Sequence, residues 1–140
     1  MRYLLLINAD KNAPAPTAAE GQAIVQAHVK FADALRAAGK FVVADRLRPD
    51  SDGARVRLKA GQPQVTDGPF TETKEALGGY YLIECDTKDE AVEWAKRCPA
   101  QDGDVIEVRQ VFEVSDFPAD VQKAADNPTV RAQILSLIHI

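Results

Sequence analysis

The chain has 140 residues, 46% of them hydrophobic and 27% charged, with a formal net charge of -4 and an isoelectric point near 5.2. This length suits one domain, and the scattered Lys and Arg residues form no basic cluster, so nucleic acid is not expected to be a direct partner. We expect no membrane segment and a cytoplasmic location, because no apolar run approaches the roughly 20 residues of a membrane helix and the N-terminus lacks a small-residue cleavage site.

Motifs for metals and cofactors are absent from the sequence. The two cysteines, Cys85 and Cys98, do not form a Cys-x-x-Cys pair, and there are two histidines. A disulfide framework and a structural zinc site are therefore not expected. Because glycine-rich phosphate and dinucleotide loops are also missing, we expect no cofactor and no metal.

The first part of the chain predicts a strand, a helix and a second strand. Residues 3–7 form a continuous apolar run of strand length. Thr17 and Glu20 have the spacing of a capping box, which predicts the start of a helix that ends at Gly39. A second strand is predicted at residues 41–47.

The middle of the chain predicts a hairpin, a tight turn and the strongest strand. Apolar and charged residues alternate from residue 56, which indicates a solvated hairpin over residues 56–66. A turn follows at residues 67–70, and Gly78-Gly79 predicts a break before a strand at residues 80–85. We interpret residues 65–84 as the rim of a pocket.

The last part of the domain predicts a second helix and a final strand. Thr87 and Glu90 repeat the capping-box spacing, and Pro99 ends the helix because proline cannot donate to the hydrogen-bond ladder. A strand is predicted at residues 105–114.

This order of elements predicts an α+β fold of the ferredoxin-like βαββαβ type with an inserted β-hairpin. Both helices would then cover one face of the sheet and leave the opposite face apolar and open. An apolar face of that size usually marks an interface. Packing two sheets face to face is the simplest way to cover it, so we predict a homodimer.

His28 and Asp67 are the candidate catalytic residues. His28 shares an apolar helical stripe with Phe31 and Leu35. It fits either a core position or acid-base chemistry, because imidazole titrates near neutral pH. Asp67 heads the turn, where its carboxylate either bonds its own backbone in an Asx-turn or acts as a second acid group.

The candidate substrate-binding residues are Arg109, Tyr80, Phe70 and Cys98. Arg109 shares a strand face with Glu107. Three roles are open to it: a solvated surface charge, a partner of the Glu107 carboxylate, or the group that holds an anionic ligand. Tyr80 and Tyr81 point to opposite faces, so one lines the pocket and the other the core. Cys98 fits core packing better than a reactive thiol, because the C-terminal end of a helix disfavours a thiolate.

Residues 67–75 read Asp-Gly-Pro-Phe-Thr-Glu-Thr-Lys-Glu, and residues 77–84 read Leu-Gly-Gly-Tyr-Tyr-Leu-Ile-Glu. Together they resemble the signature of the DGPF branch of the YCII-related proteins, and the similarity runs from Met1 to about Val114. The resemblance implies a dimeric α+β barrel built from ferredoxin-like units, in agreement with the predicted order of elements.

The resemblance also implies site residues. Some YCII-like proteins use a histidine in the first helix with an aspartate at the end of the second, and one relative is a dehydrochlorinase of chlorinated aromatic compounds. His28 and Gly39 have the spacing of the family's His-to-Gly segment, so the histidine carries over. Where those relatives have Asp-Pro, this chain has Cys98-Pro99, and Asp67 is the candidate replacement.

Two functions follow as hypotheses. In the first, the protein binds a small organic molecule near His28 and Asp67 and catalyses proton transfer or a lyase-type elimination, with Arg109 as anion holder. In the second, it is a non-enzymatic ligand-sensing or regulatory homodimer. DGPF-type proteins resemble partners encoded beside extracytoplasmic-function sigma factors, which makes such a sigma factor the candidate protein partner.

The C-terminal part is expected to lie outside the main domain. We assign the YCII-related domain to residues 1–114 and a helical extension, broken by Asn127-Pro128, to residues 115–134. Residues 135–140 read Leu-Ser-Leu-Ile-His-Ile, which one frame of the transposon mosaic-end adaptor CTGTCTCTTATACACATC encodes. We therefore expect these residues to be a sequencing artefact in which His139 has no functional weight.

Overall fold

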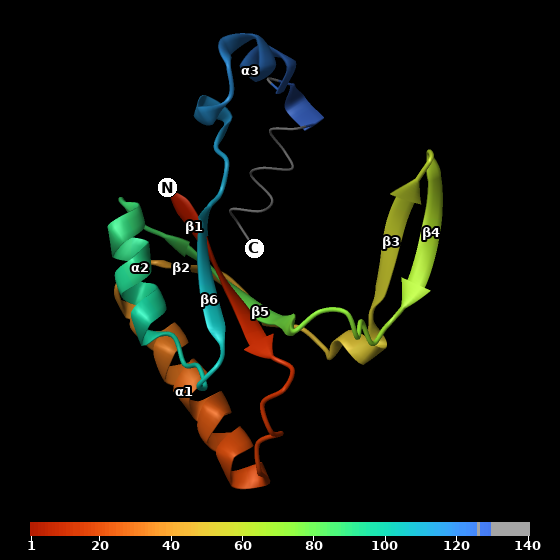
Figure 1. The fold of residues 1–140 in the computed structure, drawn as a ribbon. Helices are drawn as coiled ribbons and strands as arrows, with labels where there is room; N and C mark the ends of the chain where they lie inside the picture. Colours follow the sequence, from red (N-terminus) through yellow and green to blue (C-terminus); the bar gives the residue numbers. More distant parts are fainter. Residues whose placement is uncertain (126, 130–140) are drawn as a thin grey trace.

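The computed structural model describes residues 1–125 and 127–129 (Figure 1). Its main elements are β1 (Arg2–Asp10), α1 (Ala18–Ala37), β2 (Phe41–Arg46), β3 (Ala54–Lys59), β4 (Gln62–Asp67), β5 (Glu75–Glu84), α2 (Lys88–Arg97), β6 (Val105–Gln110) and α3 (Ala119–Ala125). Short 3-10 turns lie at Asp50–Asp52 and Val114–Asp116. The predicted order of strands, helices and inserted hairpin is confirmed.

Four strands form one sheet in the order β2-β5-β1-β6, and every neighbouring pair is antiparallel. This is the strand order of a ferredoxin-like fold, which confirms the predicted α+β class. Helices α1 and α2 lie on the same face of the sheet (Figure 1). The hairpin β3–β4 forms a separate two-stranded sheet that projects away from the body.

The core lies between the helix pair and the sheet. Its buried side chains are Tyr3, Leu5, Phe31, Leu35, Tyr81, Ile83, Cys85, Ala91 and Cys98. The α1 stripe is as predicted, with Phe31 and Leu35 buried. Because side chains alternate along a strand, Leu4, Leu6 and Leu82 point to the opposite face, where they are partly exposed.

Both helices begin at the predicted caps. The Thr17 hydroxyl accepts from the Glu20 amide at 3.2 Å, and the Thr87 hydroxyl accepts from the Glu90 amide at 3.1 Å. Each bond satisfies a backbone donor that the helix itself leaves unpaired.

The predicted break at Gly78-Gly79 was wrong, because β5 runs through both glycines. Ile7 pairs with Gly79 and Asn8 with Leu77, which leaves Gly78 as the extra residue of a bulge. A Cβ on Gly79 would lie 2.9 Å from the Asp45 carbonyl oxygen of the neighbouring strand. The two glycines therefore allow a bulge and a close strand approach inside a continuous strand.

The final strand is shorter than predicted and ends at Gln110. The Val111 amide still donates to the Arg2 carbonyl, but the Glu113 amide turns to the Asp116 carboxylate at 2.8 Å. This side-chain bond replaces the strand ladder and starts a turn that leads away from the sheet. Helix α3 lies within the predicted extension, and residues 135–140 lie outside the described residues.

Candidate functional site

The turn at Asp67–Phe70 joins the hairpin to β5 by a very close backbone approach. The Gly68 amide donates to the Gly53 carbonyl at 2.8 Å, and a Cβ on Gly68 would lie 1.8 Å from the Asp50 carbonyl oxygen. The bond between Gly68 and Pro69 is cis. Position 68 therefore requires glycine, because any side chain there would collide with the Asp50 carbonyl oxygen.

Lys11 ties this turn to the end of β1. Its Nζ lies 2.6 Å from an Asp50 carboxylate oxygen and donates to the Phe70 carbonyl at 2.6 Å and the Thr73 hydroxyl at 2.7 Å. The contact with Lys11 is the main cause that holds the pKa of Asp50 below its usual value, and a hydrogen bond from the Phe70 amide acts in the same direction. We call these four residues the Lys11 latch.

Phe70 is buried at the base of the hairpin and is 8% exposed. The guanidinium of Arg55 lies 3.8 Å from its ring centroid and also pairs with Glu72. The turn residues thus fix the hairpin to the body, and this contact accounts for Phe70 by packing.

His28 meets Tyr81 on the helix-covered side of the sheet. Its Nδ1 lies 2.7 Å from the Tyr81 hydroxyl, and the two rings stack at 5.9 Å with an angle of 12°. Tyr81 is 5% exposed, and the Phe31 ring packs edge-on against it at 5.0 Å. The hydroxyl of Tyr81 is thus held in place from α1 and β5 at once.

Burial sets the protonation state of both partners. Desolvation lowers the pKa of His28 below 6.5, and the positive charge of Arg46 lowers it further. Desolvation raises the pKa of Tyr81 to about 12, with nearby Cys98 acting in the same direction. At neutral pH the pair therefore consists of a neutral imidazole and an intact phenol.

Arg46 supplies a positive charge beside His28. It is the last residue of β2 and follows Ala44 on the strand side that faces the helices. Its side chain is exposed and forms no ion pair within residues 1–125 and 127–129. A guanidinium without a carboxylate partner is available to an anionic ligand.

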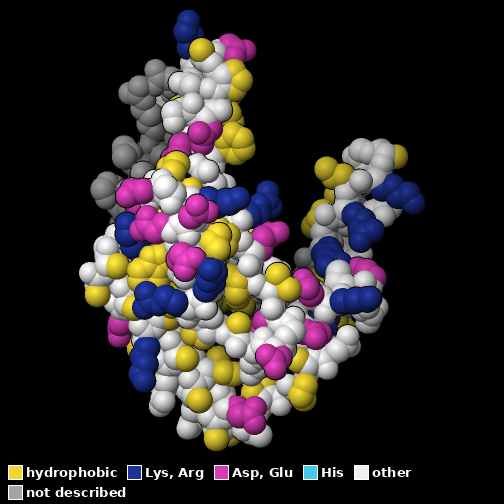
Figure 2. Space-filling view, turned by 60° about the vertical axis from the view of Figure 1, so that its left-hand side comes forward, with side chains coloured by type: hydrophobic (Ala, Val, Ile, Leu, Met, Phe, Trp, Pro, Cys, Tyr) yellow, Lys and Arg dark blue, Asp and Glu magenta, His cyan; other side chains and the backbone are white. Residues whose placement is uncertain are grey.

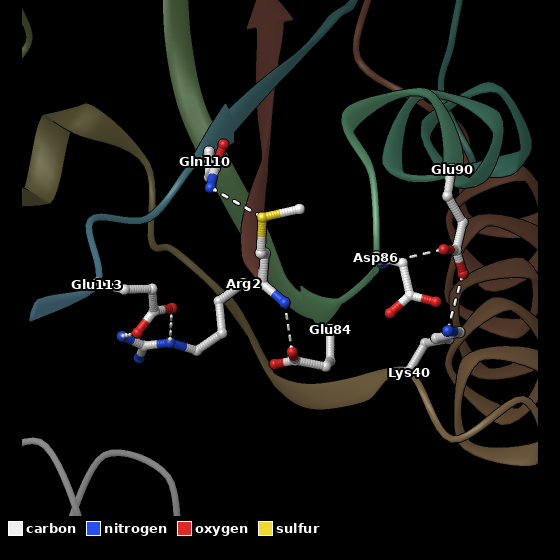
Figure 3. A network of polar contacts seen from close by, with 8 residues as sticks. Arg2, Lys40, Glu84, Asp86, Glu90, Gln110 and Glu113 are labelled. Atoms are coloured by element: carbon white, nitrogen blue, oxygen red, sulfur yellow. Dashed lines mark hydrogen bonds and ion pairs between the residues drawn. The ribbon is translucent and has the colours of Figure 1, made fainter. Parts of the chain in front are cut away.

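A hollow of about 280 Å³ lies at the N-terminal end of β1, and Figure 3 shows the charged residues that line it. It is lined by Met1, Arg2, Val42, Glu84 and Glu113. The N-terminal ammonium pairs with Glu84 at 2.6 Å, and Arg2 pairs with Glu113 at 3.1 Å. Its charged groups are paired with one another, so it offers a charged ligand fewer binding groups than the His28 site does.

The sequence now identifies the family. A profile of the YCII-related domain matches residues 1–115. The chain belongs to the YCII-related family. An uncharacterized protein of Rhizobium meliloti (strain 1021) is 49% identical over 59 residues, which make up 42% of this chain and 48% of that protein. The chain thus matches about half the length of this relative, and the DGPF branch stays a prediction.

Of the predicted catalytic residues in this YCII-related chain, His28 lies in the site just described and Asp67 does not. Asp67 is exposed at the end of β4 and pairs with Ala54 across the hairpin. The hairpin and α1 lie on opposite sides of the molecule (Figure 1). Within the described residues, the structure does not bring the two side chains together.

The predicted substrate-binding residues are also dispersed. Arg109 pairs with Leu4 and is exposed on the sheet face opposite the helices, and Tyr80 donates to Asp45 at 2.7 Å on that same face. Cys98 lies on the His28 side, where it is 7% exposed and burial raises its pKa to about 12. It is buried against the core beside Tyr81.

Sequence reasoning missed Tyr81 and Arg46 as neighbours of His28. The alternation of Tyr80 and Tyr81 showed that one of them faces the helices, but not which one. Arg46 carried no signal beyond its position at the end of a strand. Across the described residues, no group of His, Cys, Asp and Glu is arranged to hold a metal ion, and no helix has the length and hydrophobicity to cross a membrane.

Proposed function

We propose that this protein binds a small organic anion beside His28 and that His28 exchanges a proton with it. The observation that carries the proposal is the 2.7 Å contact between His28 Nδ1 and the buried Tyr81 hydroxyl, next to Arg46, which forms no ion pair with the part of the chain that the structure describes. A neutral histidine held by a fixed partner is suited to general acid-base catalysis.

Tyr81 would act by positioning the imidazole. When its oxygen accepts a hydrogen bond from Nδ1–H, the Nε2 lone pair of His28 is free to take a proton from a ligand. The Nδ1–H bond to Tyr81 persists in the imidazolium that forms, so the ring keeps its orientation through the transfer. In a Ser-His-Asp triad the catalytic histidine likewise donates its Nδ1–H to its partner, and this bond fixes the tautomer.

A phenol differs from a carboxylate because it carries no charge. It orients the ring but does not stabilise the imidazolium as an aspartate would, and the pKa of His28 accordingly stays low. We therefore expect ligands whose C–H bond is already acidic. In an elimination, His28 takes that proton, the C–H electrons form a double bond and the leaving group departs with its own pair. Arg46 would hold the carboxylate or phenolate of the ligand.

The test is an NMR titration of His28 in the full chain, with and without a panel of small carboxylates and phenols. A bound anion is expected to raise the pKa of His28, because a negative charge favours the imidazolium. Arg46→Gln should raise this pKa in the free protein and weaken anion binding, whereas Arg48→Gln, a nearby exposed control that pairs with Asp52, should do neither. The proposal fails if no ligand moves the His28 resonances.

The exposed aromatic pair Phe112 and Phe117, which follows β6, favours a second candidate function, a regulatory dimer that binds a sigma factor. Phe112 is 66% exposed and stacks on Phe117 at 5.1 Å. Exposed aromatic pairs are enriched in protein interfaces. If this candidate is right, an extracytoplasmic-function sigma factor encoded beside the gene should copurify with the chain and be lost on Phe112→Ser. Copurification that survives this substitution would count against it.

A further inference from the structure

The β3–β4 hairpin projects from the body with one apolar and one basic face. Val56 pairs with Val65 across the hairpin, and Leu58 follows on the same side. These three side chains are 65%, 69% and 78% exposed, in the order Val56, Val65, Leu58. In Figure 2 the hydrophobic side chains of the hairpin turn toward the rest of the molecule and the basic ones turn away. The basic side chains alternate with the apolar ones along β3 and are those of Arg55, Arg57 and Lys59.

The base of the hairpin is held in place, but its two strands pair only with each other in the described residues. The Lys11 latch and the Arg55–Phe70 contact fix the base to the body. An isolated two-stranded hairpin is only marginally stable in water, and a third strand stabilises it. The hairpin is therefore a directed template to which one more strand can be added.

The hydrogen-bond register decides which backbone groups such a strand would meet. The Gly68 amide donates to the Gly53 carbonyl at 2.8 Å, in register with the Ala54–Asp67 pair. Hydrogen-bonded and non-hydrogen-bonded pairs alternate along an antiparallel ladder, so the N–H and C=O groups of every second residue point outward. On β3 the outward residues are Ala54, Val56 and Leu58.

The two edges of the hairpin are not equivalent. By the same register, Pro63 is an outward residue of β4, and proline has no N–H to donate. A proline on an edge strand blocks further pairing along that edge. Each outward residue of β3 keeps its N–H, and no described residue pairs with that edge. The β3 edge is therefore open to a further strand.

The side chains of β3 determine what kind of strand fits there. Neighbouring strands place their side chains next to each other on the same face, where opposite charges attract and like charges repel. Residues 54–66 contain three basic side chains and no acidic one. Arg57 and Lys59 form no ion pair with any residue that the structure describes. A complementary strand therefore has acidic side chains on this face and apolar ones on the other.

The same charges disfavour the β3 strand of a second copy as the occupant. Edge-to-edge pairing of two β3 strands would bring two rows of basic side chains together on one face. Basic residues on edge strands prevent self-association in this way. The complementary strand therefore belongs to a different protein.

We propose that the outer edge of β3 binds an extended segment of a partner protein by strand addition, and that acidic and apolar side chains alternate along this segment. Backbone hydrogen bonds to β3 supply affinity, and the alternation supplies specificity, because each face of the added strand continues one face of the hairpin. This site is separate from His28, so its tests do not depend on the proton-transfer function.

The first test measures, by fluorescence anisotropy, the binding of the end-blocked peptide Glu-Val-Glu-Val-Glu-Val-Glu to the full chain. The peptide Glu-Glu-Glu-Glu-Val-Val-Val has the same composition without the alternation, and it is expected to bind at least ~10-fold more weakly. Three results overturn the proposal: no binding of the alternating peptide, equal binding of both peptides, or equal binding of a single-stranded DNA oligonucleotide. The last two identify a basic surface that selects charge alone.

The second test uses a matched pair of proline variants. Val56 and Val65 face each other in a non-hydrogen-bonded pair, so proline at either position removes an outward N–H and leaves the bonds between β3 and β4 in place. Val56→Pro is expected to weaken binding of the alternating peptide at least ~10-fold, because it blocks the β3 edge. Val65→Pro should stay within about threefold of the parent. Two variants that bind the peptide equally well overturn the proposal.

The third test reverses the charge of the basic face and does not rely on a loss of binding alone. Arg57→Glu, Lys59→Glu is expected to bind Lys-Val-Lys-Val-Lys-Val-Lys at least ~10-fold more tightly than the acidic peptide. The control Lys30→Glu, Lys96→Glu makes the same change of net charge at exposed positions of α1 and α2. It should keep the parent's preference for the acidic peptide. The proposal is overturned if the first variant keeps that preference or if the control reverses it.

Discussion

At the scale of single residues, burial decides the chemical state of the groups near His28. The same loss of solvent that keeps the His28 imidazole neutral keeps Tyr81 and Cys98 protonated, because each charged form would be poorly hydrated there. The three groups therefore form a largely uncharged cluster, and Arg46 is the charge at its edge.

Acid is expected to destabilise the protein through His28. In the unfolded chain the imidazole titrates near 6.5, and in the folded chain it titrates lower, so between the two pKa values the unfolded chain binds more protons. The free energy of unfolding should be at its full value above pH 6.5 and fall as pH drops through this window. Urea denaturation of the parent and of His28→Gln at a series of pH values checks this. A parent and a variant with equal slopes between pH 5 and 6.5 would contradict the prediction.

Both thiols are expected to be unreactive in the folded protein. Burial raises the pKa of Cys98 to about 12 and also raises that of Cys85, so neither thiolate is populated at neutral pH. An aromatic disulfide reagent should therefore modify the native chain slowly and the urea-unfolded chain at once. Rapid modification of Cys98 in the native protein would show that it lies in an accessible pocket.

At the scale of elements, replacing glycine with alanine is expected to change the free energy of unfolding in opposite directions in the Asp67–Phe70 turn and in α1. Gly68 faces the Asp50 carbonyl so closely that a Cβ cannot fit, whereas Gly21 in α1 has no atom within 4 Å of such a Cβ. The same substitution therefore distinguishes a steric requirement from a propensity cost.

Gly68→Ala is expected to lower the free energy of unfolding by about 1–3 kcal/mol or more, because the turn must open to admit the methyl group. Gly21→Ala is expected to raise it by about 0.5–1 kcal/mol, since alanine is favoured in a helix. Urea denaturation of both variants and the parent measures the two signs. Equal effects from the two substitutions would show that the close approach at Asp50 is easily relieved.

At the scale of the whole molecule, the hairpin β3–β4 and the body, which is the four-stranded sheet with its helices, are separate units of structure. Within the described residues, the buried hydrophobic cluster lies between the four-stranded sheet and its helices, and β3 and β4 pair with each other alone. The hairpin should therefore be dispensable for folding of the body.

Replacing residues 55–66 with an Asn-Gly turn should leave the body folded. Ala54 and Asp67 already face each other in register, which suits a two-residue hairpin loop. NMR chemical shifts of β1 and β5 are expected to persist after the excision. A chain that unfolds on this excision would show that the hairpin belongs to the folding core.

The sequence by itself determined the elements and their order. Thr17 and Thr87 predicted the two helix starts, alternating residues predicted the β3–β4 hairpin, and apolar runs predicted the central strands. These signals could be read from the sequence because each acts within a few residues of the chain. The family also followed from the sequence, since the match covers residues 1–115. The local reading failed at Gly78-Gly79, where the neighbouring strands, not the glycines themselves, decide between a turn and a bulge.

Only the tertiary structure decided which side chains meet. Tyr81 is 53 residues from His28 in the sequence, and Lys11 is 59 from Phe70, yet both pairs are in direct contact. Such contacts depend on strand register and on which sheet face the helices cover, and neither has a local pattern. For this reason the sequence paired His28 with Asp67, whereas the fold gave it Tyr81 as a partner and Arg46 as a neighbouring charge.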